Sequence, residues 1–264
     1  MNKPPTECRL LIDPPAAGAW NMAVDEVLLE WATAQNNLGW RIYGWEVPTL
    51  SLGYFQTYAD RCSHAPSRDC AVVRRLTGGG AIVHDVELTY SLVVPGAHPL
   101  AKRRDLLYNT VHKTLIDTLA ELGAVASLRA ALPQVPPGEE PFLCFRRRSP
   151  GDVLVDTHKV AGSAQRRRRG AVLQHGSVLL GRSRAAPALN GLTEITGKPF
   201  HADQVADAWL KKIAENLFLA WRREPFSEKE CRRAEELVET RYATAGWTEH
   251  RHRETTPPIG PEPF

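Results

Sequence analysis

Three consecutive glycines, Gly78-Gly79-Gly80, lie between two short apolar segments and constrain the fold of this chain more than any other feature. Residues 71–75 and 81–84 on either side have the apolar and β-branched character of strands. Glycine permits a positive φ and lets another molecule approach the backbone, which a Cβ would prevent. The segment is neither a Walker A loop nor a dinucleotide-binding fingerprint. It is either a hairpin without a ligand or a ligand-binding loop bordered by Arg75 and His84.

Helices are predicted near the start and in the last third of the chain, with strands mostly between them. Apolar residues at helical spacing predict one helix over residues 20–31 and another over residues 105–122. Short apolar and β-branched segments predict strands at 41–45, 48–55, 71–75, 81–84, 88–94, 153–155, 160–164 and 171–175. This order favours an α+β fold in which helices flank a mixed or mostly antiparallel sheet.

The pattern predicts a single domain over residues 1–255, helical from about residue 200, and a disordered tail at 256–264. Residues 131–143 carry four prolines and predict a loop. No apolar run is long enough for a membrane-spanning helix, and the N-terminal segment lacks the apolar core of a signal peptide. The five cysteines form no Cys-x-x-Cys pair. We therefore expect a cytoplasmic protein that does not associate with membranes.

Two reactive side chains are candidates for chemistry. Cys144 follows the proline-rich loop and precedes three arginines at 146–148, whose positive potential favours the nucleophilic thiolate. Lys159 opens a segment of small residues, where an amine can polarise a carbonyl or act as a base. The alternatives are an inert, half-buried thiol and a solvated lysine.

The net charge of +3, from 33 Lys and Arg against 30 Asp and Glu, is too small to indicate nucleic-acid binding. The arginine runs at 146–148 and 166–169 form either a solvated face or a docking surface for an acidic protein. No aromatic recognition motif accompanies them, so no nucleic acid is expected. Cys62, His64 and Cys70 lack a fourth ligand and the spacing of a zinc site, and we predict no metal.

Four segments together resemble the biotin/lipoate protein ligase superfamily, on its lipoate and octanoate side. They are residues 20–26, 48–56, 74–91 and 159–180. The most specific match is Arg-Arg-Leu-Thr-Gly-Gly-Gly-Ala-Ile-Val-His-Asp followed by Lys-Val-Ala-Gly-Ser-Ala-Gln. The Gly-Arg-Gly-Arg loop of biotin ligases is missing, which disfavours biotin. The resemblance implies a catalytic fold like that of class II aminoacyl-tRNA synthetases and biotin ligases.

Within this family, lipoate ligases activate a free acid with ATP, whereas octanoyltransferases draw the acyl group from acyl carrier protein onto a cysteine. The placing of Cys144 shortly before Lys159 resembles the ligase-related octanoyltransferases, and the Arg-Asn-Asp triplet of the ligases is absent. Gly80-Ala81 is nevertheless the ligase form, since many of these transferases carry arginine as the last of the three glycine positions. An ATP-dependent lipoate or octanoate ligase, a lipoyl-domain amidotransferase and a non-catalytic binder remain alternatives.

The resemblance to the octanoyltransferases also implies roles and partners. Cys144 is the implied nucleophile, and Lys159 holds the carbonyl or exchanges protons. The implied substrate-binding residues are Arg75, Gly78, Gly79, Gly80, His84, Gly162, Ser163, Ala164 and His175, with backbone amides near Gly162 and Ser163 facing the oxyanion. No cofactor is expected, and ATP with magnesium enters only in the ligase alternative. The expected partners are octanoyl-acyl carrier protein and lipoyl domains of the glycine cleavage H protein or a 2-oxoacid dehydrogenase E2.

Overall fold

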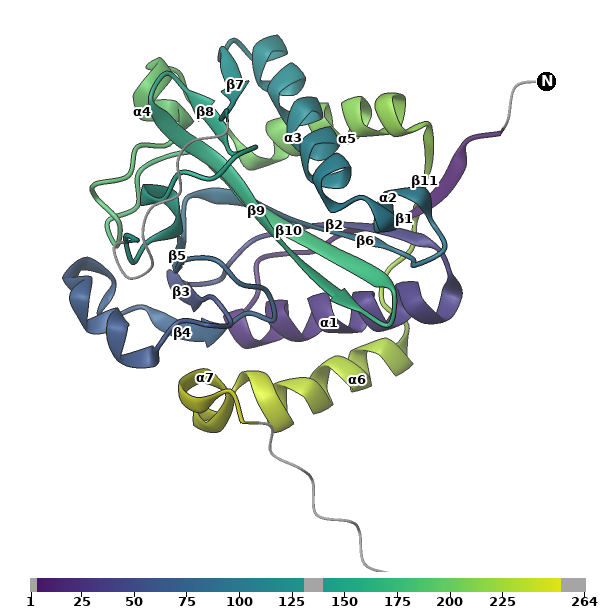
Figure 1. Cartoon of the computed structure of the whole chain (residues 1–264), viewed down its shortest axis with the longest axis horizontal. Coiled ribbons are helices and arrows are strands. Elements are labelled where there is room, and N and C mark those ends of the chain that lie inside the picture. Colours follow the sequence, from purple (N-terminus) through teal and green to yellow (C-terminus); the bar gives the residue numbers. More distant parts are fainter. Residues whose placement is uncertain (1–3, 131–139, 253–264) are drawn as a thin grey trace, which may run out of the picture.

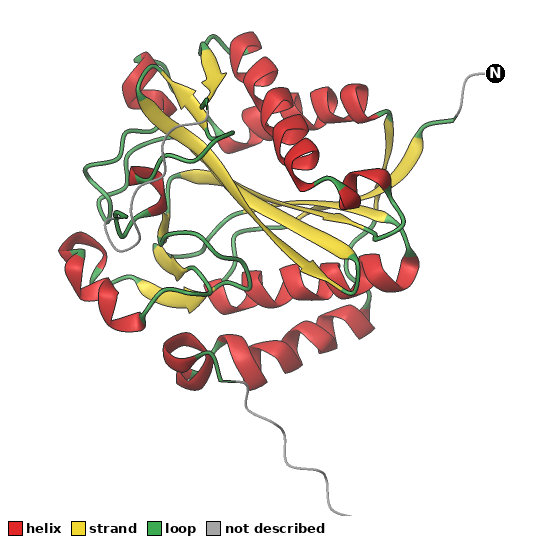
Figure 2. Cartoon of the chain, viewed as in Figure 1, coloured by secondary structure: helices red, strands yellow, loops and turns green. Residues whose placement is uncertain are grey.

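The computed structural model describes residues 4–130 and 140–252 (Figure 1). A long mixed sheet runs through the centre, with helices on both of its faces (Figure 2). The α+β class predicted from the sequence is confirmed. The predicted tail at 256–264 and residues 131–139 of the predicted loop lie outside the described residues. In the described ranges, no helix is both long and apolar enough to span a bilayer.

The central sheet has eight strands, and β1 pairs in parallel with β2 and β11 while the other pairs are antiparallel. In spatial order they are β11 (Leu219–Arg223), β1 (Thr6–Ile12), β2 (Leu38–Tyr43), β6 (Glu87–Val94), β10 (Ala171–Leu179), β9 (His158–Arg168), β8 (Val153–Val155) and β7 (Ala126–Leu128). A second sheet consists of β4 (Ala71–Arg74), β3 (Thr49–Leu52) and β5 (Ile82–His84).

Two helical layers cover the central sheet. The helices are α1 (Gly18–Gln35), α2 (Pro99–Lys102), α3 (Arg104–Glu121), α4 (Leu192–Thr196), α5 (Ala202–Leu217), α6 (Glu228–Leu237) and α7 (Ala245–His250), with short turns η1 (Tyr58–Ser63), η2 (Ala65–Ser67), η3 (Cys144–Arg146) and η4 (Val238–Tyr242). Helices α3 and α5 bury apolar side chains against one face of the sheet. Helix α1 packs on the other face and is itself covered by α6 (Figure 1).

The structure differs from the sequence prediction at the two edge strands of the sheet, β11 and β7, and at β1 beside β11. No strand was predicted at β1, β7 or β11. Strand β11 lies in the part expected to be helical from about residue 200, so that expectation holds for α5, α6 and α7 but not for Leu219–Arg223. The side chains of β11 are at most half-buried, because the strand lies at the edge of the sheet. Its sequence therefore carries little of the apolar pattern that identifies a strand.

Helix α1 is buried on more faces than its apolar stripe predicts. Asp25 and Glu26 lie off that stripe, yet their exposed fractions are 2% and 0%. Both carboxylates are satisfied by partners from distant segments: Asp25 by Arg41, and Glu26 by Arg168 and Arg241. The helix between the sheet and α6 therefore contributes buried charge as well as apolar packing.

The small sheet holds the glycine segment against the central sheet. The Arg75 amide donates to the Leu52 carbonyl at 2.9 Å, and the Tyr54 amide donates to the Thr77 carbonyl at 2.8 Å. Gly79 has φ 91°, which favours glycine. A Cβ on Gly53 would lie 2.0 Å from the Gly79 carbonyl oxygen, so this close approach requires glycine at residue 53.

We expect Gly53→Ala to lower the free energy of unfolding by about 1–3 kcal/mol, because the added methyl displaces the Gly79 carbonyl. Gly78→Ala is the matched control, since its Cβ would make an ordinary contact of 3.6 Å with the Phe55 ring. Urea unfolding of the two variants measures the difference. Equal stability of both variants would contradict the close approach of Gly53 to the Gly79 carbonyl.

Candidate active site

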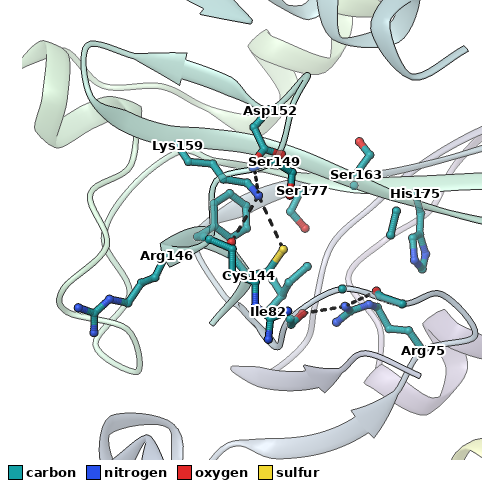
Figure 3. Close-up of a pocket in the computed structure, with 18 of the residues that line it drawn as sticks. Arg75, Ile82, Cys144, Arg146, Ser149, Asp152, Lys159, Ser163, His175 and Ser177 are labelled. Carbon is teal, nitrogen blue, oxygen red and sulfur yellow. Dashed lines mark hydrogen bonds and ion pairs between the residues drawn. The ribbon is translucent and has the colours of Figure 1, made fainter. Parts of the chain in front are cut away.

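A cavity of about 1550 Å³ lies between the glycine segment, the strands β6, β9 and β10, and the turn η3 (Figure 3). All of the site residues predicted from the sequence line it: Arg75, Gly78, Gly79, Gly80, His84, Cys144, Lys159, Gly162, Ser163, Ala164 and His175. The structure thus brings together segments separated by up to 100 residues, whereas the chemical role of each residue stays a prediction.

Cys144 and Lys159 face each other across the cavity (Figure 3). Lys159 Nζ lies 3.8 Å from Cys144 Sγ and 3.3 Å from the Cys144 carbonyl oxygen. The Cys144 amide donates to the Ala81 carbonyl at 2.7 Å, so the cysteine is anchored to the residue that directly follows the glycines. Arg147 secures the same segment by an ion pair with Glu140 and a bond from Nε to the Pro141 carbonyl.

Lys159 is not the solvated lysine of the alternative interpretation, because its exposed fraction is 4% and it has a buried partner. Asp152 Oδ2 lies 2.9 Å from Lys159 Nζ. The carboxylate also accepts the Ser149 amide at 2.7 Å and the Tyr108 hydroxyl at 3.2 Å. A register shift between β8 and β9 falls beside Lys159, and such a bulge re-aims the neighbouring side chain. The ammonium group is therefore held beside the sulfur by a fixed carboxylate.

Ser163 belongs to a chain of hydrogen bonds in which each donor and acceptor can be assigned. His112 Nδ1 lies 2.6 Å from the Gly151 carbonyl, which can only accept, so Nδ1 carries the proton. Burial lowers the pKa of His112 to about 4, and the neutral ring accepts the Ser163 hydroxyl at Nε2 over 2.6 Å. The Tyr90 hydroxyl in turn donates to Ser163 Oγ at 2.6 Å and accepts from the Gln174 amide at 2.9 Å. The Ser163 side chain is thus fully engaged away from Cys144.

The backbone amide of Ser163 is engaged as well. It donates to the Tyr108 hydroxyl oxygen at 3.2 Å. An oxyanion at this position, as expected from the resemblance, would therefore compete with Tyr108 for the amide. A Cβ on Gly162 would lie 2.6 Å from Lys159 Cε, so glycine leaves room for the lysine stem rather than for the substrate alone.

Arg75 and His84 form a buried polar cluster at the glycine segment. Arg75 donates to Ser51 Oγ at 2.6 Å and to the carbonyl of Gly80 at 2.9 Å, and burial lowers its pKa to about 10. His84 contacts Ser51 Oγ through Nε2 at 2.6 Å and Glu87 through Nδ1 at 2.5 Å. Burial lowers the pKa of His84 despite the nearby carboxylate, so the ring is neutral at pH 7. The cluster holds the glycine carbonyls in place.

His175 connects the glycine segment to α1. Its Nδ1 lies 2.8 Å from Asp25 Oδ2, and its Nε2 lies 2.7 Å from Thr77 Oγ1. Burial acts to raise the pKa of Asp25, but the hydrogen bond and charge of His175 and the charge of Arg41 outweigh it and lower the pKa. Asp25 is therefore an ionised anchor for the histidine that orients Thr77.

Sequence reasoning gave no role to several polar residues of this site, among them Asp25, Tyr108, His112 and Asp152. Tyr108 and His112 are four residues apart on α3, which places both on one helix face. That pair of polar residues beside the apolar stripe was a usable signal. Nothing in the local pattern distinguishes Asp152 from the exposed Asp156, because its partner Lys159 lies on the next strand.

The chain is similar to known proteins over most of its length. A family model described as the lipoyl protein ligase A/B catalytic domain matches residues 17–188. The octanoyltransferase LipM of Brevibacillus brevis is 31% identical over 274 residues, covering 92% of this chain and 99% of the relative. The octanoyltransferase LipM of Bacillus cereus is 38% identical over 172 residues, or 61% of each chain. The T. acidophilum protein Ta0514 with bound lipoic acid has a TM-score of 0.76 at 23% identity, over 92% of this chain and 99% of that one, and so shares its fold.

Asp152→Asn is expected to lower the free energy of unfolding by about 3 kcal/mol, because it leaves the Lys159 ammonium buried without its counter-ion. The double variant Asp152→Asn/Lys159→Met should recover much of this loss. Asp156→Asn, an exposed change four residues away, is the control and should shift stability by less than about 0.5 kcal/mol. Urea unfolding checks all three, and equal effects at Asp152 and Asp156 would rule out the ion pair.

His112 should make the fold sensitive to mild acid. Its pKa falls from 6.5 to about 4 on folding, so above pH 6.5 the ring is neutral in both states. As the pH falls from 6.5 toward 4, the unfolded chain binds the proton first and stability is lost. Between pH 7 and pH 5 the wild type should lose about 2 kcal/mol more than His112→Gln. Denaturant unfolding at both values measures this, with the exposed His201→Gln as a control that should behave as wild type.

Proposed function

The chain belongs to the lipoyl protein ligase A/B catalytic domain family, and we propose that it moves an octanoyl group from acyl carrier protein, through a thioester on Cys144, to a lysine of a lipoyl domain. It is a transferase that acts in octanoyl transfer for protein lipoylation. The carrier protein as donor, the thioester and the acceptor, a lipoyl domain of an H protein or an E2, are our proposal.

The 3.8 Å approach of Cys144 Sγ to Lys159 Nζ carries the proposal. In the first step Sγ attacks the octanoyl carbonyl, the carbonyl–sulfur bond to the carrier breaks, and the thiol proton passes through Lys159 to the departing sulfur. In the second step the acceptor amine attacks the Cys144 thioester, forms the amide, and returns a proton to Sγ. The thioester is already activated, so neither step needs a nucleotide. Asp152 keeps Lys159 beside the sulfur throughout.

The acyl chain fits the part of the cavity beyond the glycine segment. Met22, Tyr43, Trp45 and Ile82 line this side. Burying each methylene contributes roughly 0.8 kcal/mol, so the depth of the apolar part selects for chain length. The side chains of Arg75 and His84 are held by protein partners, which leaves the apolar surfaces to contact the chain.

An ATP-dependent lipoate or octanoate ligase is the second candidate. The glycine segment has the ligase form at Gly80-Ala81, and a cavity of about 1550 Å³ exceeds the roughly 300–1,000 Å³ typical of pockets for one small ligand. In that reaction Cys144 has no covalent role, and ATP with magnesium is required.

Incubation with octanoyl-acyl carrier protein, followed by intact-mass measurement, tests the proposal. The wild type should gain one octanoyl group that hydroxylamine removes, and Cys144→Ser should gain no thioester. Cys62→Ser, which changes an exposed cysteine outside the cavity, should be acylated as fast as wild type. Lys159→Met should slow acylation at least about 100-fold, because the proton relay is lost.

The other outcomes identify the alternatives. A ligase shows no adduct with the carrier and modifies a lipoyl domain only with ATP and free acid. An amidotransferase is acylated by an octanoylated lipoyl domain and not by the carrier. A protein with no covalent change under any of these conditions is a binder, and each of these results would overturn the proposal.

A further inference from the structure

A second, smaller hollow of about 170 Å³ lies on the other side of Lys159 from the glycine segment. We name it the basic groove, and it is lined by Phe145, Arg146, Arg148, His158, Lys159, Ala188, Leu189 and Asn190. Phe145, Arg146, Arg148 and Lys159 also line the large cavity, so the two hollows are neighbours that share these side chains. The basic groove therefore lies next to the cavity that contains Cys144.

The polar groups of the basic groove are donors. Within residues 4–130 and 140–252, neither Arg146 nor Arg148 has a carboxylate within 4 Å, whereas Arg147 between them pairs with Glu140. Arg148 donates to backbone carbonyls, at Phe145 over 2.9 Å and at Thr157 over 3.1 Å. Guanidinium groups without a counter-ion bind phosphate oxygens strongly.

His158 and Asn190 also line the groove, and they are engaged with each other. Asn190 Oδ1 accepts from Arg182 at 2.7 Å, which fixes its amide so that Nδ2 faces His158 Nε2 at 3.3 Å. His158 Nε2 is thus the acceptor, and Nδ1, which carries the proton, is buried and has no partner in the described residues. The groove therefore offers an anion the guanidinium groups of Arg146 and Arg148, and its lining contains no acidic side chain.

The other arginine run differs in its position rather than in its ion pairs, since only Arg168 of residues 166–169 has a carboxylate within 4 Å in the described part of the chain. Arg168 pairs with Glu26 and Glu30, and Arg166 lies over the Tyr54 ring at 5.3 Å. This run stabilises the β9–β10 hairpin against α1. Of the two runs considered as docking surfaces from the sequence, only residues 146–148 line the cavity.

The position of the groove matches the shape of a thioester. Figure 3 shows Arg75 and Arg146 on opposite sides of Cys144, with the Arg146 guanidinium pointing away from the sulfur. The carbonyl carbon of a thioester bound at Cys144 carries two substituents, the acyl chain and the sulfur-linked arm of the carrier. These two substituents extend in different directions. If the acyl chain extends toward the glycine segment, the carrier's arm extends toward Arg146. That arm is a phosphopantetheine, and its only charged group is a phosphodiester.

We propose that the basic groove binds the phosphodiester of the donor's phosphopantetheine arm through Arg146 and Arg148. This inference rests on the proposed function, because it takes a carrier thioester as the donor. It assigns donor recognition to the groove rather than to the run at 166–169.

The test measures acylation of Cys144 by octanoyl-phosphopantetheine and by octanoyl-pantetheine, which lacks the phosphate. Wild type should reach half-maximal rate at about tenfold lower concentration of the phosphorylated donor. Arg146→Ala/Arg148→Ala should lose this preference, so that the two donors reach half-maximal rate at the same concentration. Arg166→Ala/Arg169→Ala is the matched control and should keep the preference.

Each of the other results would contradict phosphodiester binding in the basic groove. Equal use of both donors by wild type would exclude a phosphate site, and an equal loss of both donors in the double variant would indicate a structural role. A defect confined to transfer from the acyl-enzyme to a lipoyl domain would assign the surface to the acceptor. If no thioester acylates wild type while ATP and free acid support modification, the proposed function itself has failed.

Discussion

The buried ion pair between Lys159 and Asp152 is the interaction on which this site depends. A lysine ammonium out of water is stable only beside a counter-charge, so the carboxylate both permits the burial and sets where Nζ points. Asp152 is fixed in turn by the Ser149 amide and the Tyr108 hydroxyl, and Tyr108 also receives the Ser163 amide. One carboxylate therefore connects the loop after Cys144, helix α3 and strand β9.

Much of the architecture was predictable because local patterns and packing agree there. The strands that form the middle of the sheet are buried on both faces and rich in β-branched residues, and they were found within a few residues of their ends. The edge strand β11 was missed because half of its surface faces solvent. The site residues carried by the glycine segment and by Lys159 to Ala164 were identifiable because glycine and small residues are required where backbones approach closely.

Partners across the fold were not predictable, since they depend on which segments become neighbours. Arg147 and Arg148 are adjacent in the sequence, but one is neutralised by Glu140 and the other is left with carbonyl partners. Arg168 is neutralised by Glu26, 142 residues away. Within the described residues each run has one arginine paired with a carboxylate, Arg147 or Arg168, and it is position in the fold that separates the runs, because only residues 146–148 line the cavity.

The geometry also gives a reason for a covalent intermediate beyond its chemistry. In the proposed reaction the carrier's arm and the acceptor lysine both need the carbonyl carbon beside Cys144, and Lys159 with Asp152 closes the far side of the sulfur. Without an intermediate, both proteins would have to reach that carbon at the same time. Holding the acyl group on Sγ allows the carrier protein to dissociate before the lipoyl domain binds. The same lysine then serves both steps, because each one moves a proton to or from the same sulfur.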